Sequence, residues 1–134
     1  MGAAPAARAP AIPAYLVGEW ATANARFQGV ALFEGAALYL DPDGSGALIG
    51  GPPPIGMRLT AQFDSASAML ATTLRDNENA PITTARFRYD RPTQTLRGKH
   101  DGSDSVTYSR RQPQVPAAIR RMLCDVAAPP PTCS

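Results

Sequence analysis

The stretch GKHDGSDS at residues 98–105 contains the residue types of a hydrolase triad. His100 could act as a general base, with one of the serines as nucleophile and one of the aspartates orienting the imidazole. Members of a triad come from separate elements that meet in space, and neighbours on one tight turn cannot reach that geometry. The other carboxylates form no evident acid–base pair, and no glycine-rich phosphate loop joins a strand to a helix. We therefore interpret the segment as a solvated turn and predict that the chain is not an enzyme.

The stretch DPDGSG at residues 41–46 has the spacing of a calcium loop. Asp41, Asp43, Ser45 and Gly46 match the first half of an EF-hand, but the twelfth position, which needs a bidentate glutamate, is Pro52. The flanks GAALYL and ALIG are typical of strands rather than helices, and Asp-Gly is a hairpin signal. We predict a β-hairpin turn, with a weak calcium site as the alternative. Since the chain has a single histidine, no metal centre or cofactor is predicted.

The two cysteines, Cys124 and Cys133, flank the segment DVAAPPPT. This spacing does not fit a zinc site, and it favours a local disulfide that closes a short loop. Such a bond would contribute roughly 2 to 3 kcal/mol by restricting the unfolded chain. Disulfides persist in oxidising compartments, so the pair indicates a periplasmic or secreted protein. The alternative is two free thiols in a cytosolic tail.

The charge of the chain is close to balanced, with a formal net charge of +2 and 18% charged residues. This small surplus does not indicate a nucleic-acid partner, because such proteins carry larger and more clustered positive charge. No stretch approaches the roughly 20 apolar residues that span a bilayer, so no membrane insertion is expected. Arginines do occur in three local pairs, which we interpret as solvated faces, with an anionic partner as the alternative: Arg86/Arg88, Arg110/Arg111 and Arg120/Arg121.

Short segments that alternate apolar and polar residues occupy the chain from Tyr15 to Gln112. This period of two, interrupted by turn residues, is typical of antiparallel strands with one wet face. We expect eight strands, with a final segment that either adds a ninth or closes the sheet: 17–24, 28–34, 36–40, 46–50, 57–63, 69–75, 82–89 and 94–99, then 104–110.

Two of the turns between these segments repeat each other. FDSASAML at residues 63–70 and YDRPTQTL at residues 89–96 share an aromatic residue, Asp, Ser or Thr, and Leu at the same positions, 26 residues apart. An aspartate at a strand end accepts hydrogen bonds from backbone N–H groups two residues on. Hairpins are therefore predicted at Asp64 and Asp90.

The two ends of the chain differ from this pattern. We expect residues 1–14 to form a flexible Ala/Pro leader, residues 15–112 the β domain, and residues 113–134 a helix and a Pro-rich tail. The stretch VPAAIRRMLCDV changes to helical period, and Pro116 suits a first turn. Its apolar face, which should pack on the sheet, is predicted to contain four residues: Val115, Ala118, Ile119 and Met122.

Gly18-Glu19-Trp20 opens the first expected strand directly after the leader, and a meander of strands and one late helix follow. This arrangement resembles the lipocalin/calycin superfamily, whose first strand begins with a Gly-x-Trp motif. The resemblance implies an all-β fold, an antiparallel up-and-down eight-stranded barrel with a short C-terminal helix. It also implies that Trp20 closes one end of the barrel and that Arg110 or Arg111 lies across its indole, a favourable cation–π geometry.

An eight-stranded barrel can enclose one small molecule. Our first hypothesis is therefore a small bacterial lipocalin-like protein that binds an apolar or amphipathic ligand. Strand alternation places the lining at Leu38, Leu59, Phe87 and Tyr108, with Met57 nearby, although the same residues would also form a filled core.

The second hypothesis is a protein-binding inhibitor, similar to the protease-inhibiting calycin barrels, that acts through its N-terminal leader and loops. Small calycin barrels that inhibit proteases carry an extended leader ahead of the Gly-x-Trp strand, and APAIPAYLVGEW is similar in arrangement. A proline-stiffened leader loses less entropy on docking. A third possibility is a scaffold whose loops make its contacts.

Overall fold

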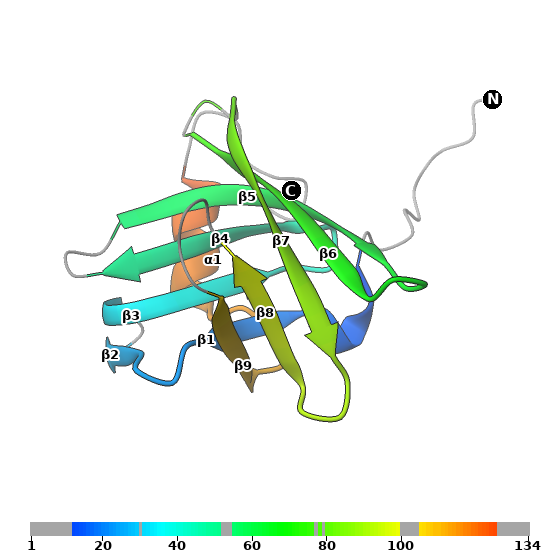
Figure 1. The fold of residues 1–134 in the computed structure, drawn as a ribbon. Coiled ribbons are helices and arrows are strands. Elements are labelled where there is room, and N and C mark those ends of the chain that lie inside the picture. The colour runs from blue at the N-terminus through cyan, green and yellow to red at the C-terminus, as the bar shows by residue number, and fades with distance from the viewer. Residues whose placement is uncertain are drawn as a thin grey trace.

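The computed structural model describes residues 12–29, 31–51, 55–76, 78, 80–99 and 105–125 of the 134-residue chain. Nine strands and two short helices occur in this part, in the order shown by the colours of Figure 1. They are the 3₁₀ helix η1 (Ala14–Leu16), β1 (Gly18–Ala21), β2 (Arg26–Gln28), β3 (Ala31–Leu40), β4 (Ser45–Gly51), β5 (Ile55–Asp64), β6 (Met69–Arg75), β7 (Pro81–Asp90), β8 (Thr95–Lys99), β9 (Val106–Gln112) and α1 (Ala117–Cys124).

Eight of the strands close into an antiparallel barrel, as the fold class predicted from the sequence requires. From β3 to β9, consecutive strands pair with each other. Strand β1 pairs with both β9 and β3 and so closes the ring. The ninth strand, β2, pairs only with the first part of β3 and stands outside the closed ring. The connections are therefore up-and-down throughout.

The third strand differs from the prediction. The segments 28–34 and 36–40 were expected to be separate strands, but β3 runs unbroken through Gly35. Gly35 has a φ of 85°, and a Cβ there would lie 2.7 Å from the Cα of Ala25. The irregularity reverses the alternation, so that Leu32 and Ala37 reach the same outer cluster. A glycine that appeared to mark a turn instead keeps one strand continuous.

The first strand is also shorter than predicted. The expected segment 17–24 ends as a strand at Ala21, and a turn leads into the separate strand β2. Thr22 stabilises this break because its hydroxyl accepts a hydrogen bond from the Ala36 N–H at 3.1 Å. The Thr22 hydroxyl thus takes the place of a backbone carbonyl as the acceptor for the Ala36 N–H of β3.

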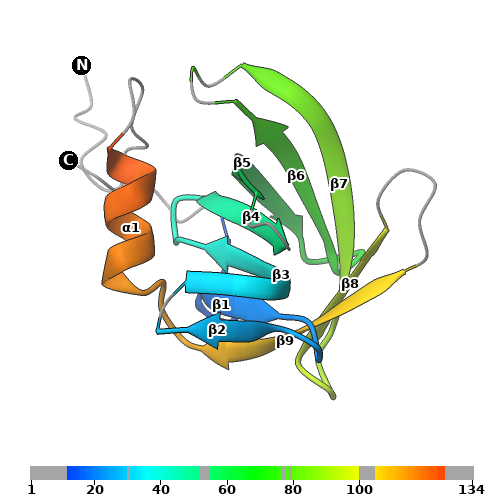
Figure 2. The same cartoon turned by 90° about the vertical axis from the view of Figure 1, so that its left-hand side faces the viewer.

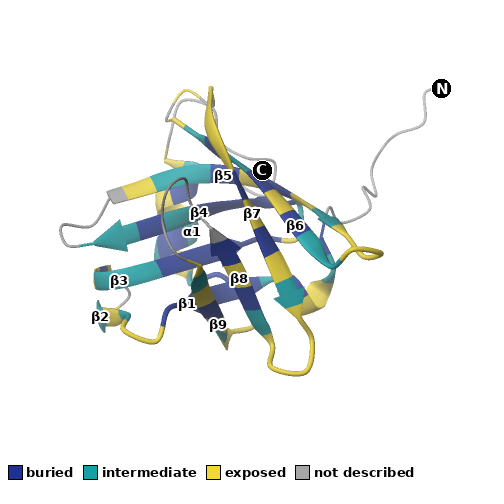
Figure 3. Ribbon diagram, in the orientation of Figure 1, coloured by how far each residue is buried: buried dark blue, intermediate teal, exposed yellow. Residues whose placement is uncertain are grey.

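Two apolar clusters lie on opposite sides of the barrel wall. The inner cluster fills the barrel and includes Trp20, Leu38 and Phe87. The outer cluster lies between α1 and the outer face of β2, β3 and β4, on the side where Figure 2 shows the helix. Figure 3 shows the resulting alternation along β7, where buried and exposed residues follow one another. The β-wall is therefore apolar on both faces only where the helix covers it.

Helix α1 packs on the barrel as expected, through Val115 and Ile119 as predicted, but with Leu123 in place of Met122. Val115, Ile119 and Leu123 are buried at a spacing of four residues, whereas Met122 is 62% exposed. The prediction for Met122 was wrong because the helix turns its i, i+4 row toward the sheet and leaves the next position facing solvent. No helix in the described ranges is long and apolar enough to cross a bilayer.

Cys124 ends α1 and is not a free thiol. Its expected partner, Cys133, lies outside the described residues. The pairing of Cys124 with Cys133 therefore stays a prediction.

The repeated turns are confirmed. Asp64 accepts a hydrogen bond from the Ser67 hydroxyl at 2.6 Å, and Asp90 accepts the equivalent bond from Thr93. The next residue has a left-handed φ in both turns, at Ala68 and Gln94. The same local chemistry therefore builds the β5–β6 and β7–β8 hairpins.

The DPDGSG segment is a hairpin turn, as predicted. The Gly44 N–H donates to the Asp41 carbonyl oxygen at 2.9 Å, and Gly44 has a φ of 87°. The Asp43 carboxylate accepts from the Ser45 N–H at 2.9 Å. Within the described ranges, no group of three His, Cys, Asp or Glu side chains is placed to hold a metal ion.

The folded part begins earlier than the expected domain boundary. Ile12, which the sequence placed in the leader, is buried in the inner cluster together with Leu16. Residues 1–11 and His100 with residues 101–104 lie outside the described residues. The predictions of a docking leader and of a solvated His100 turn are therefore untested.

Candidate ligand-binding site

One end of the barrel is closed by the segment that precedes β1. Trp20 is fully buried, and its Nε1 donates to the Leu16 carbonyl oxygen at 3.0 Å. Arg110 on β9 donates from Nε to the Val17 carbonyl oxygen at 3.1 Å and from Nη2 to the Ala14 carbonyl oxygen at 3.0 Å. The Ala14 carbonyl also accepts from the Val17 N–H at 3.2 Å, so Arg110 binds both ends of the turn that closes η1. Trp20 and Arg110 together fix η1 across this end.

Gly18 allows β9 to approach this closed end. Its φ is 134°, and a Cβ on it would lie 2.0 Å from the Gln112 carbonyl oxygen. A side chain there would force β1 and β9 apart. The glycine of the Gly-x-Trp motif therefore has a steric role at the barrel closure.

The expected stacking of an arginine on the indole differs from the contacts observed. Arg110 is the register partner of Trp20, but its guanidinium is hydrogen-bonded to backbone carbonyls. Arg111 instead lies over the ring of Phe27, at 5.6 Å from the centroid. Alternation along β9 explains this, because neighbouring residues point to opposite faces of the wall.

Aromatic rings make up the closed end. Tyr89 stacks on Tyr15 with centroids 5.3 Å apart and meets Trp20 edge-on at 6.2 Å. Phe63 meets both Tyr15 and Tyr89 edge-on, at 6.2 and 6.4 Å. Edge-to-face and offset pairs of this kind stabilise a structure beyond the area that they bury.

The predicted lining residues all belong to the inner cluster. Leu38, Leu59, Phe87 and Tyr108 are buried, and Phe87 meets Tyr108 edge-on at 5.7 Å. Met57 packs against them and is half-buried. In the middle of the barrel these side chains touch one another and form a packed layer.

Tyr108 gives this layer a polar group without a charge. Burial raises the pKa of its hydroxyl to about 12, so the group is neutral at physiological pH. A neutral phenol can donate or accept a hydrogen bond. Thr72, another buried polar residue in the wall, already donates to the Ala85 carbonyl oxygen at 2.8 Å.

Half-buried apolar side chains on β3, β4, β5 and β9 pack against this layer, and we call them the upper ring: Ala36, Leu48, Met57 and Val106. Leu48 is the register partner of both Leu38 and Met57, and Ala36 lies opposite Gly50. These residues pack against the inner cluster, yet each keeps part of its surface exposed. Small residues next to partly exposed apolar ones leave surface that a ligand could cover.

Of the upper ring, the sequence predicted only Met57. Ala36, Leu48 and Val106 were missed. The signals that could have identified them were their inward positions in the strand alternation and the small residues opposite them on neighbouring strands. The arrangement presents apolar surface over a closed, neutral floor and suits a molecule with an apolar body. Comparisons of this chain with protein-family models, curated proteins and solved structures found no match.

Proposed function

We propose that this protein is a lipocalin-like binding protein that holds a small apolar or amphipathic molecule at the upper ring. The observation that carries the proposal is the contrast in burial along the barrel. Leu38 and Phe87 are fully packed, whereas Leu48 and Val106 face inward and remain half-buried. Apolar surface of this kind gains free energy when a ligand covers it.

The expected affinity follows from the area that a ligand would cover. Each 100 Å² of apolar surface removed from water is worth about 2.5 kcal/mol. A micromolar complex requires about 8 kcal/mol in net free energy after the entropic costs of binding. A ligand would therefore have to cover more than about 300 Å² of apolar surface to reach this value.

The same proposal includes an oxidising location, in the periplasm or outside the cell. Cys124 is not a free thiol, which is consistent with a disulfide to Cys133. Disulfides of this type are rare where cellular thiols are kept reduced.

The test is binding of a fluorescent long-chain fatty-acid probe, measured by titration. Ala36→Phe places a ring in the upper ring and should weaken binding at least tenfold. Gln62→Phe adds the same ring on the exposed outer face of β5 and should leave the affinity within twofold of the starting protein. The absence of saturable binding to the unmodified protein would rule out the proposal.

A further inference from the structure

The three arginine pairs of the sequence have different surroundings. Arg110 is bound to carbonyl groups at the closed end, Arg111 lies over Phe27, and Arg120 is paired with Asp41. In contrast, Arg86 and Arg88 point outward from β7 and are exposed. Arg110, Arg111 and Arg120 therefore have structural contacts, whereas Arg86 and Arg88 have none among the described residues.

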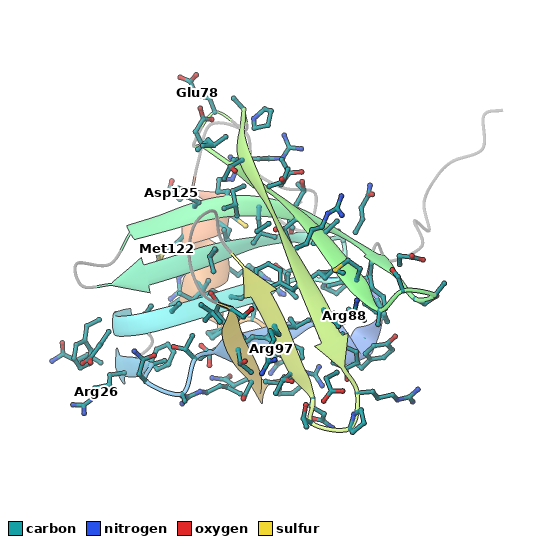
Figure 4. All side chains as sticks on the ribbon, in the orientation of Figure 1. Arg26, Glu78, Arg88, Arg97, Met122 and Asp125 are labelled. Atoms are coloured by element: carbon teal, nitrogen blue, oxygen red, sulfur yellow. The ribbon has the colours of Figure 1, made fainter. Side chains whose placement is uncertain are left out.

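Across the β7–β8 hairpin, positive residues face positive residues. Arg88 is the register partner of Arg97, and Arg86 is the register partner of Lys99. Arg88 and Arg97 appear on the two adjoining strands in Figure 4. Like charges directly opposite each other on a sheet are destabilising. The fold thus keeps an unfavourable arrangement on this outer face.

The register partners on either side of the two arginines carry no charge. The flanking register partners are Met69 on β6, opposite Arg88, and Thr107 on β9, opposite Arg97. Within the ranges that the structure describes, neither arginine forms an ion pair. The nearest acidic residue in the hairpin, Asp90, accepts a hydrogen bond from the Thr93 hydroxyl.

The facing arginines line a surface hollow of about 440 Å³. Arg97 donates from Nε to the Thr107 hydroxyl at 3.4 Å, which leaves its terminal amino groups without a partner among the described residues. Three threonine hydroxyls lie around the cations, of which Thr93 is bonded to Asp90 and Thr95. The hollow is lined by Arg88, Asp90, Thr93, Thr95, Arg97 and Thr107.

We propose that this hollow is a binding site for an oxyanion of the phosphate class. Two guanidinium groups offer planar sets of N–H donors that suit the oxygens of such an anion. The next exposed arginine, Arg86, lies two residues further along β7, at about 7 Å. That spacing suits an anion with a second charged group, such as a diphosphate, or a headgroup that extends along the hairpin.

Asp90 opposes this binding because its carboxylate lies in the same lining. Its negative charge repels an anion, so the proposal predicts that Asp90→Asn strengthens binding. A general loss of folded protein could not produce a gain in affinity. This variant therefore separates a specific site from damage to the fold.

The primary experiment is titration calorimetry with inorganic diphosphate at low ionic strength. Arg88→Gln and Arg97→Gln should each weaken binding at least tenfold, and Asp90→Asn should strengthen it about threefold. Matched controls remove one exposed arginine elsewhere, in Arg26→Gln and Arg121→Gln, and should change the affinity less than twofold. No saturable binding, or equal losses in the controls, would overturn the proposal.

A second arm distinguishes the two sources of this chemistry. Cosedimentation with phosphatidic acid vesicles that Arg88→Gln abolishes would support the site and assign it to a lipid headgroup. Saturable binding of diphosphate without cosedimentation would support the site and assign it to a soluble phosphate compound. Ala36→Phe should leave both readouts unchanged, because the upper ring is on the inner side of the wall.

Discussion

Arg120 of α1 donates a hydrogen bond to the carboxylate of Asp41, which is completely buried beside the β3–β4 turn. The two residues are 79 positions apart in the chain, and their contact links the helix to the barrel. Burial raises the pKa of the Asp41 carboxyl, and the Arg120 hydrogen bond and charge offset part of that effect. The second oxygen of Asp41 has no hydrogen-bond partner in the described part of the chain. Arg120 thus limits the cost of a buried charge.

Arg120→Ala should destabilise the protein more at pH 7 than at pH 4. With its folded pKa raised above 3.8, Asp41 favours folding at low pH, and this contribution is lost as pH rises through the folded pKa. Without Arg120, the pKa of Asp41 in the folded protein rises further, and the stability lost as pH rises becomes larger. We expect the free energy of unfolding to decrease by about 1 to 3 kcal/mol at pH 7. This is less than for a fully buried pair, because the side chain of Arg120 is 42% exposed. Urea denaturation at both pH values measures it, with Arg121→Ala as the control. Equal losses at the two pH values would contradict the argument.

Gly18→Ala should destabilise the barrel by at least about 2 kcal/mol, because it combines an unfavourable φ with a clash against the Gln112 carbonyl group. Gly29→Ala is the matched control. Gly29 also has a positive φ, of 65°, but nothing lies within 4 Å of an added Cβ. Its substitution should cost about 1 kcal/mol from backbone strain alone. Thermal unfolding followed by Trp20 fluorescence gives the comparison, and similar costs for both variants would disprove the steric role.

Arg97→Glu should stabilise the protein while it removes phosphate binding. The substitution turns the like-charge pair with Arg88 into an opposite-charge pair, a gain of roughly 0.2 to 1 kcal/mol at low salt. The gain should shrink in 1 M salt, where charges are screened beyond about 3 Å. Arg97→Gln should give an intermediate value in the same denaturation series. A loss of stability in Arg97→Glu would show that the facing arginines do not destabilise the folded protein.

Ile119→Ala should cost about 2 to 4 kcal/mol, whereas Met122→Ala should cost less than about 0.5 kcal/mol. Ile119 is buried between α1 and the outer face of β3 and β4, and Met122 faces solvent. Both variants remain helical, since alanine is the best helix former. Guanidinium denaturation of the two proteins tests which face of α1 packs on the barrel. A cost of more than about 1 kcal/mol for Met122→Ala would show that Met122 also packs on the barrel.

Local signals predicted much of this fold. The turns at Asp64 and Asp90 were found because their hydrogen bonds lie within a few residues, and period-two alternation placed Phe87 and Tyr108 inside. The continuity of β3 was missed because a glycine such as Gly35 can mark either a turn or an irregular strand. A feature was predicted correctly where the contact that determines it joins residues close together in the sequence.

Long-range pairs were the main omission. The contact of Asp41 with Arg120 joins distant segments, and no spacing rule could reveal it. The facing of Arg88 and Arg97 was within reach, since a hairpin at Asp90 with Asp90 opposite Thr95 sets that register. The upper ring required knowledge of which inward residues the rest of the chain leaves half-covered.

The pairing of β1 with β9 also sets the order in which the protein can be completed. Glu19 and Gln112 are register partners although 93 residues separate them. During synthesis, the strand of Trp20 is made early and can pair with β3 at once, but its other edge stays unpaired until β9 has left the ribosome. A nascent chain that stops before Ser109 thus exposes open strand edges, which favour pairing with other chains. Pairing of β9 with β1 closes the barrel and removes these open edges.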